Sequence, residues 1–206
     1  MHFANVFEAI ADAVPENEAL VCGDNKRSWQ EFDNRAARLS QAFLNAGLEA
    51  NGKVGFYLYN GNEYIESYFA TIKTRGVAVN INYRYVEKEL QYLLEYSDTE
   101  ILIYHSSLSE RVAKVTAGMD QIKLLIEVDD GGNHYAKALR YEDVIADNSP
   151  AARIERAHDD QFMNFTGGTT GMPKGVVYHI GEVTDFYLAS LPSFYGFDLT
   201  LDSEAA

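Results

Sequence analysis

Residues 164–177 read NFTGGTTGMPKGVV, in which four glycines, three threonines, a proline and a lysine stand between apolar residues. Glycine allows positive φ angles and a close approach of the backbone to a ligand. Successive backbone N–H groups then form a concavity that binds anions, and the threonine hydroxyls and the lysine add further donors and a positive charge. The stretch therefore predicts a polyphosphate-binding loop made of Thr166, Gly167, Gly168, Thr169, Thr170, Gly171 and Lys174.

The loop differs from the phosphate loop of P-loop NTPases. That pattern requires G-x-x-x-x-G-K followed by Ser or Thr, whereas here Pro173 precedes Lys174 and Gly175 follows it. The hydroxyl that would bind a metal ion after the lysine is missing, which weakens a P-loop interpretation. A flexible polar loop or a hairpin turn would explain a glycine pair alone, but not a run of this chemistry that ends in P-K-G.

The segments around the loop alternate between helical and strand-like patterns. We expect helices over 4–14, 28–47, 62–76, 86–97, 109–118 and 139–147, and strands over 19–22, 26–29, 53–59, 77–81, 100–104, 123–128 and 160–165. Strands that are continuously apolar favour a mainly parallel sheet covered on both faces. The expected fold is therefore a layered α/β/α architecture, with the loop at the carboxyl end of a strand, where ligands bind in such sheets.

Several local signals refine these expectations. Ser28 and Glu31 have the spacing of a capping box, and Gly47 suits a left-handed helix end. One face of the helix over 62–76 should carry the apolar residues to the core; this set is Tyr64, Ile65, Tyr68, Phe69 and Ile72. Tyr57, Tyr59, Tyr64 and Tyr68 are expected in the core and at an interface rather than as a platform for bases, and Arg84 is expected to be solvated or salt-bridged.

Composition limits the classes of partner. The 206 residues contain 17 Lys and Arg against 31 Asp and Glu, a net charge of −14, which opposes binding to nucleic acid and to anionic membranes. The lone cysteine, Cys22, cannot form an internal disulfide; we expect it to be buried and the chain to be cytoplasmic. We expect no signal peptide and no transmembrane segment. His105, His134, His158 and His179 lack ligand spacing, so no metal site is assigned, although His179 could approach a ligand at the loop.

The segment FTGGTTGMPKGV resembles the phosphate loop of the adenylate-forming (AMP-binding) enzymes, whose common form is Y-T-S-G-T-T-G-x-P-K-G-V. It departs at Gly167, where many members carry Ser, and at Phe165, where Tyr is common. Upstream, NGKVGFYL and KTRGVAVNINYR are similar to the opening half of these enzymes in order and spacing. The resemblance covers residues from about 5 to 178, and the sequence of these motifs looks most like that of an acyl-CoA synthetase of the fatty-acid type.

This resemblance implies a two-step ligase reaction. ATP and a carboxylate give an acyl-adenylate and pyrophosphate, and a thiol, usually coenzyme A, then takes the acyl group. The loop residues would hold the β- and γ-phosphates with Mg²⁺ nearby, and none is assigned as a general acid or base. We expect an α/β subdomain over 1–165, the loop and the following strand over 166–178, and the start of a further subdomain over 179–206.

Later segments of the adenylate-forming pattern are not found in the 206 residues. These are the Y-G-x-T-E segment, the Y-x-T-G-D segment, the hinge and the late lysine. We therefore expect an N-terminal part of a ligase that lacks its C-terminal part, has little or no activity alone and exposes apolar surface. Two alternatives stay open: a non-catalytic domain that binds a nucleotide or a partner, and, more remotely, an unrelated P-loop-like ATPase.

Overall fold

The computed structural model describes residues 1–166 and 172–195, with side chains up to residue 191. The helices are α1 Phe3–Ala13, α2 Trp29–Asn45, α3 Asn62–Lys73, α4 Glu87–Tyr96, α5 Ser109–Thr116, α6 Tyr141–Asp147 and α7 Ile180–Tyr195, with a short 3₁₀ turn η1 at Ser106–Leu108. The strands are β1 Glu18–Cys22, β2 Asn25–Ser28, β3 Lys53–Tyr57, β4 Val77–Asn80, β5 Thr99–His105, β6 Leu124–Val128, β7 Leu139–Arg140, β8 Gln161–Thr166 and β9 Lys174–His179.

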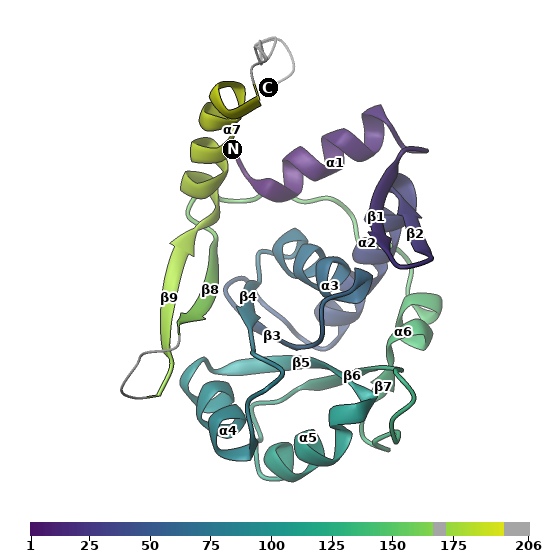
Figure 1. Ribbon diagram of the computed structural model, residues 1–206, viewed down its shortest axis with the longest axis vertical. Helices are drawn as coiled ribbons and strands as arrows, with labels where there is room; N and C mark the ends of the chain where they lie inside the picture. The colour runs from purple at the N-terminus through teal and green to yellow at the C-terminus, as the bar shows by residue number, and fades with distance from the viewer. Residues whose placement is uncertain (167–171, 196–206) are drawn as a thin grey trace.

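The main sheet has seven strands in the order β7-β6-β5-β3-β4-β8-β9. All neighbours run parallel except β8 and β9, which pair antiparallel. Strands β1 and β2 form a separate antiparallel pair beside α2. The expected mainly parallel α/β architecture is therefore confirmed (Figure 1).

Helices cover both faces of the parallel part of the sheet. Along β3 and β5, Phe56 and Ile103 face a core shared with α1, α2, α3 and α6, whereas Tyr57 and Tyr104 face a second core shared with α4 and α5. Because successive side chains of a strand point to opposite faces, a strand buried on both sides reads as a continuous apolar run. Figure 1 shows α4 and α5 across the sheet from α2 and α3.

Local signals at the helix ends are confirmed. Glu31 N donates to Ser28 Oγ at 3.2 Å, and Ser28 N donates back to Glu31 Oε2 at 2.8 Å, which completes the capping box. Gly47 has φ 79°, as its helix-ending role requires. These contacts fix the start and the end of α2.

Two expectations about burial are wrong. Ile65 is 40% exposed, although its neighbours on α3 pack inward. Cys22 is exposed rather than buried, because β1 belongs to a two-stranded sheet whose terminal residues lie beyond the cover of α2.

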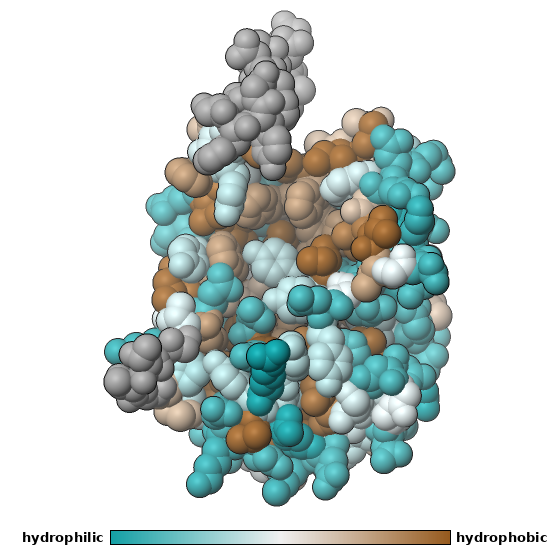
Figure 2. All heavy atoms as spheres, in the orientation of Figure 1, coloured by the Kyte–Doolittle hydropathy of each residue, from teal (hydrophilic) through white to brown (hydrophobic). Residues whose placement is uncertain are grey.

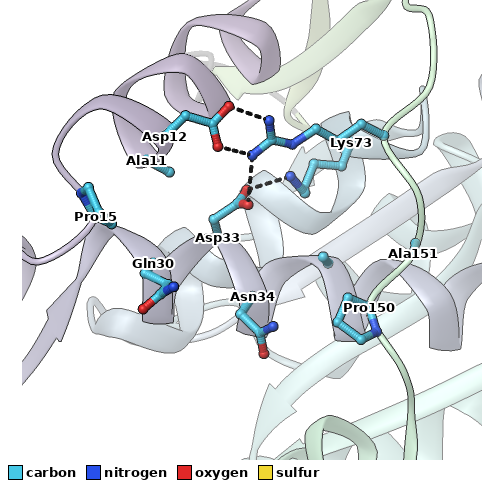
Figure 3. Close-up of a pocket in the computed structure, with 11 residues that line it drawn as sticks. Ala11, Asp12, Pro15, Gln30, Asp33, Asn34, Lys73, Pro150 and Ala151 are labelled. Atoms are coloured by element: carbon cyan, nitrogen blue, oxygen red, sulfur yellow. Dashed lines mark hydrogen bonds and ion pairs between the residues drawn. The ribbon is translucent and has the colours of Figure 1, made fainter.

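A segment without regular structure, residues 148–160, connects α6 to β8 across the helical layer. Its cations reach acidic groups on α1 and α2. Arg153 donates to Asp12 at 2.6 and 2.8 Å and to Asp33 on α2 at 3.3 Å, and Arg156 donates to Glu8 at 2.8 Å. Lys73, at the end of α3, pairs with both Glu8 and Asp33 and is only 5% exposed. Figure 3 shows Asp12, Asp33 and Lys73 pointing toward one another from three helices. We call this set of side chains the ionic network; its members are Glu8, Asp12, Asp33, Lys73, Arg153 and Arg156.

Replacing Lys73 with methionine should destabilise the fold. The change leaves the buried carboxylate of Glu8 and the half-buried carboxylate of Asp33 without one of their cations, and breaking a buried pair costs about 3 kcal/mol or more. We expect the lower end of that range because Arg156 and Arg153 still contact Glu8 and Asp33. The measurement is urea unfolding.

Lys26→Met is the matched control for Lys73→Met. Lys26 lies 2.7 Å from Glu18, but the two side chains are 57% and 59% exposed, so its loss should cost less than about 1 kcal/mol. Equal small losses for both variants would show that the ionic network contributes little to stability.

His2, the N-cap of α1, should make stability depend on pH. Its Nδ1 accepts a hydrogen bond from Ala4 N at 3.1 Å, and its ring is buried 3.6 Å from Asp160. Burial lowers the pKa of His2 from 6.5 to about 4, although Asp160 opposes this shift. Between these pH values the unfolded chain binds a proton that the folded chain does not. The contribution of neutral His2 is therefore complete above pH 6.5 and is lost as the pH falls toward 4.

The loss amounts to at most about 1.4 kcal/mol per pH unit. His2→Asn keeps an acceptor for the helix cap and removes the titration, so its unfolding free energy should fall less between pH 6.5 and 4. Carboxylates such as Glu8, whose pKa is lowered from 4.5 and whose contribution is lost as the pH falls below that value, are common to both proteins. Identical pH profiles for the two proteins would contradict the prediction.

Candidate functional site

The two described ends of the candidate phosphate loop lie side by side. Thr166 is the last residue of β8, Lys174 is the first of β9, and the two are Cα partners in the antiparallel pair. Thr166 Oγ1 donates to the carbonyl oxygen of Lys174 at 3.5 Å, and both residues are exposed. The structure thus brings Thr166 and Lys174 together, while Gly167, Gly168, Thr169, Thr170 and Gly171 lie outside the described residues.

The hairpin β8–β9 presents these two residues at the carboxyl edge of the sheet. Strand β8 runs parallel to β4, with Asn164 opposite Asn80. The carboxyl ends of β3, β4, β5 and β8 therefore share one edge, where open α/β sheets bind their ligands. Lys174 takes part in none of the ion pairs formed by the described residues, so its charge is not neutralised by a side chain placed there.

Close packing explains the residues that flank the lysine. Gly175 lies opposite Phe165, and a Cβ at Gly175 would come within 2.9 Å of Met163 Sδ. Pro173 is buried, and the ring of Phe165 contacts that of Tyr96 on α4, with centroids 6.1 Å apart. Packing at Pro173 and Gly175 therefore fixes the backbone on both sides of Lys174, while the Lys174 side chain stays in solvent.

Aromatic and hydroxyl groups line the neighbouring part of the same edge. Tyr59 lies between Tyr83 and His105, with ring centroids 4.8 Å from each. Tyr59 N donates to His105 Nδ1 at 3.1 Å, and burial lowers the pKa of His105, which keeps this ring neutral and accepting at physiological pH. Arg84 is exposed and lies over the Tyr83 ring at 5.5 Å. Sequence analysis did not identify this cluster, because the residues come from three separate segments.

The other candidate residues lie away from the loop ends. His179 is the last residue of β9, roughly 17 Å along the strand from Lys174. Its Nδ1 lies 3.1 Å from the carbonyl oxygen of Asp159, and α7 begins at the next residue. His179 therefore belongs to the far end of the hairpin and does not approach a ligand at the loop. Among the described residues no group of three His, Cys, Asp or Glu side chains could hold a metal ion.

A cavity of about 460 Å³ lies between α1, α2 and the segment 148–160 (Figure 3). Its charged lining consists of Asp12, Asp33, Lys73 and Arg153, which are already paired with one another in the ionic network. The cavity is also remote from the carboxyl edge of the sheet. We therefore assign it a structural role.

Apolar surface is exposed beside the hairpin, as the sequence led us to expect. Val177 and Tyr178 on β9 are 46% and 40% exposed, and Phe186 and Tyr187 on α7 are 66% and 52% exposed. Figure 2 shows apolar residues gathered on the face between α1 and the hairpin. No helix within the described part of the chain combines the length and the hydropathy that crossing a bilayer requires.

Curated relatives share this sequence over most of its length. A 3-oxocholest-4-en-26-oate–CoA ligase from Rhodococcus rhodochrous is 36% identical over 187 residues, covering 89% of this chain and 34% of the relative. The medium-chain acyl-CoA ligase Mig from Mycobacterium avium is 33% identical over 194 residues, covering 86% of this chain and 35% of the relative. The chain therefore spans about a third of the length of these relatives.

Solved structures share the fold. An anthranilate CoA ligase, AuaEII, in complex with anthranoyl-AMP superposes with a TM-score of 0.84 at 20% identity, covering 93% of this chain and 36% of that one. ATP-bound MatB from Rhodopseudomonas palustris gives a TM-score of 0.79 at 25% identity, covering 96% and 38%. The family model described as AMP-binding enzyme matches residues 7–201. The chain, with its candidate phosphate loop between β8 and β9, therefore belongs to the AMP-binding enzyme family.

Proposed function

We propose that the chain supplies the ATP-phosphate site of an ATP-dependent carboxylate–CoA ligase, of which it forms the N-terminal part. The observation that carries the proposal is the pairing of Thr166 and Lys174 at the carboxyl edge of the sheet, with the Lys174 charge exposed. A cation and a hydroxyl beside a glycine-rich segment suit the oxygens of a polyphosphate. The relatives named above act on carboxylates with large apolar groups, which supports a fatty acid or a related acyl substrate.

In this reaction a carboxylate oxygen attacks the α-phosphorus of ATP, and the bond to pyrophosphate breaks. The thiol of coenzyme A then attacks the acyl carbon, and AMP leaves with its electron pair. Negative charge grows on the departing pyrophosphate, and Lys174 with the hydroxyls of Thr166, Thr169 and Thr170 would stabilise it, together with the N–H groups of Gly167, Gly168 and Gly171. Positioning and charge neutralisation, rather than proton transfer, are the contributions proposed for these residues.

Magnesium fits this arrangement as a companion of the phosphates. The described residues offer no acidic cluster for a protein-held cation, and Mg²⁺ is commonly bound through substrate phosphates and water with only one or two carboxylates. When bound, the ion would neutralise phosphate charge. We assign it no ligand among these residues.

The division of labour along the chain is part of the proposal. Residues 1–165 would form the supporting subdomain, 166–178 the phosphate site, and 179–206 the start of a further subdomain, in a cytoplasmic enzyme. Because acyl transfer requires both reactants to be positioned, and this site positions only the phosphates, we propose little or no ligase activity for the 206 residues alone. The alternative is a non-catalytic nucleotide- or partner-binding domain, which the exposed apolar face beside the hairpin favours.

Lys174→Gln should weaken binding of Mg·ATP to the 206-residue chain. Loss of a charge-assisted contact of about 1.5–3 kcal/mol corresponds to a rise in Kd of roughly 10- to 100-fold. Isothermal titration calorimetry measures the change. Lys114→Gln is the control, because Lys114 is also exposed but sits on α5 and pairs with Glu87. Equal Kd values for Lys174→Gln and the unmodified chain, or no ATP binding by the unmodified chain, would refute the assignment.

Carboxylate-dependent exchange of labelled pyrophosphate into ATP separates the ligase from the alternative. The proposal expects no exchange from the 206 residues alone and exchange from a chain of the relatives' length that contains them. ATP hydrolysis without any dependence on a carboxylate would instead support an unrelated ATPase.

A further inference from the structure

The hairpin β8–β9 is held at the end opposite the candidate loop by one buried carboxylate. We propose that Asp160, through its ion pair with Arg75, is a positioning residue that sets where this hairpin stands relative to β4, and so where Thr166 and Lys174 meet a phosphate. The ligand in this inference rests on the proposed function, whereas the positioning rests on contacts among described residues. Among the described residues, neither Arg75 nor Asp160 forms a hydrogen bond or an ion pair with Thr166 or Lys174.

The Arg75–Asp160 pair joins the starting points of two neighbouring strands. Arg75 lies two residues before β4, and Asp160 lies one residue before β8. Arg75 Nε donates to both carboxylate oxygens at 3.0 and 3.1 Å, and Arg75 Nη2 donates to Oδ1 at 2.9 Å. The Asp160 side chain is only 2% exposed, whereas that of Arg75 is 34% exposed, so the carboxylate is shielded from solvent and the guanidinium stays partly solvated. An arginine–carboxylate contact with several donors fixes orientation as well as distance.

The same residue also fixes the other strand of the hairpin. The carbonyl oxygen of Asp160 accepts a hydrogen bond from Ile180 N, the first residue of α7, at 2.7 Å. Gly181 N donates to the His158 carbonyl at 3.0 Å, and a Cβ on Gly181 would come within 2.4 Å of that carbonyl oxygen and of the His158 ring. The end of β9 and the start of α7 are thus seated directly on the turn that carries Asp160.

That turn is closed by Asp160 itself. Ala157 N donates to Asp160 Oδ2 at 3.1 Å, and Asp160 N donates to the Ala157 carbonyl at 3.2 Å. His2 Nε2 lies 3.6 Å from Oδ2 and has no hydrogen-bond partner among the described residues. With the pKa of His2 lowered to about 4 by burial, the ring is neutral near pH 7. Arg75 is therefore the cation that pairs with this carboxylate.

The backbone of Arg75 points to the same conclusion. Arg75 has φ 61°, in the left-handed region that glycine adopts more easily than arginine. Its carbonyl oxygen accepts from Asn51 N at 2.9 Å, which extends the junction to the segment before β3. The side chain of the arginine held in this conformation contacts Asp160.

A shift at this junction would be carried to the loop. Within the described residues, strand β8 shares three register pairs with β4, and β9 pairs with β8 alone. Thr166 and Lys174 lie at the opposite end of the six-residue strands, so a small rotation about the Asp160 end displaces them relative to the carboxyl edge.

The test combines amide hydrogen exchange with Mg·ATP titration on the 206-residue chain, comparing Asp160→Asn and Arg75→Gln with the unmodified chain. We expect amides of β8 and β9 to exchange about tenfold faster in both variants, with those of β3 and β5 unchanged, since local opening reports local stability. The Kd for Mg·ATP should rise about threefold to tenfold in each single variant. The Kd of the double variant should not exceed that of the single variant with the higher Kd, because both substitutions remove the same ion pair. Arg75→Lys, which keeps the charge and loses the forked contact, gives the same readout where Asp160→Asn does not fold.

Asp12→Asn is the matched control, because Asp12 also makes a forked contact, with Arg153, but its side chain is 62% exposed and lies in the ionic network. It should leave exchange of β8 and β9 and the Kd unchanged. The inference would be overturned if Asp160→Asn left the exchange rates of the hairpin amides unaltered, or raised exchange equally over the whole sheet. Either result would overturn it even if Lys174→Gln abolished ATP binding and so upheld the proposed function. Faster hairpin exchange in a chain that does not bind ATP would refute the phosphate function and the loop-positioning role, and leave Asp160 as a structural support only.

Discussion

The fold depends on how an irregular segment is held while it crosses a layer of helices. Strand β7 lies at one edge of the sheet and β8 near the other, so the chain between them must cross α2 and α1 through residues 148–160. This segment has no helix or strand of its own to satisfy its backbone. Besides a few backbone hydrogen bonds, side chains hold it: Arg38 donates to the Asn148 carbonyl at 2.7 Å, and Arg156, whose side chain is 2% exposed, donates to Glu8.

The ion pairs that hold this segment carry a desolvation cost, which their multiple hydrogen bonds offset. Taking a carboxylate and an ammonium group out of water is unfavourable unless several well-placed partners replace the water. Glu8 has such partners in Lys73 and Arg156, and these contacts lower its pKa although burial acts to raise it. In a chain with a net charge of −14, cations placed between acidic helices also relieve local repulsion. Lys174 is used differently, since it stays exposed at the far side of the molecule.

Local sequence patterns predicted most helices and strands, because apolar periodicity and capping residues depend on neighbouring positions in the chain. In α2, the apolar residues Phe32, Ala36, Leu39 and Phe43 recur every three or four positions, and all four are buried. The same reasoning failed for Ile65, because helical spacing defines a face but not how far the neighbouring elements cover it. It failed for Cys22 because a strand pattern does not say whether the strand joins the main sheet or a two-stranded pair.

The candidate site divides in the same way. The motif predicts which residues donate to a phosphate, because glycine, threonine and lysine each have a chemistry that can be read one residue at a time; that assignment stays a prediction. It did not predict that Thr166 and Lys174 would be register partners of an antiparallel pair, nor that Tyr59 and Tyr83 would meet on the same edge. Least of all did it predict Arg75 and Asp160, which are 85 residues apart and meet only because β8 joins the sheet beside β4. Chemistry that lies within one short segment can be predicted from sequence, whereas the support that orients it depends on strand order, which no single segment encodes.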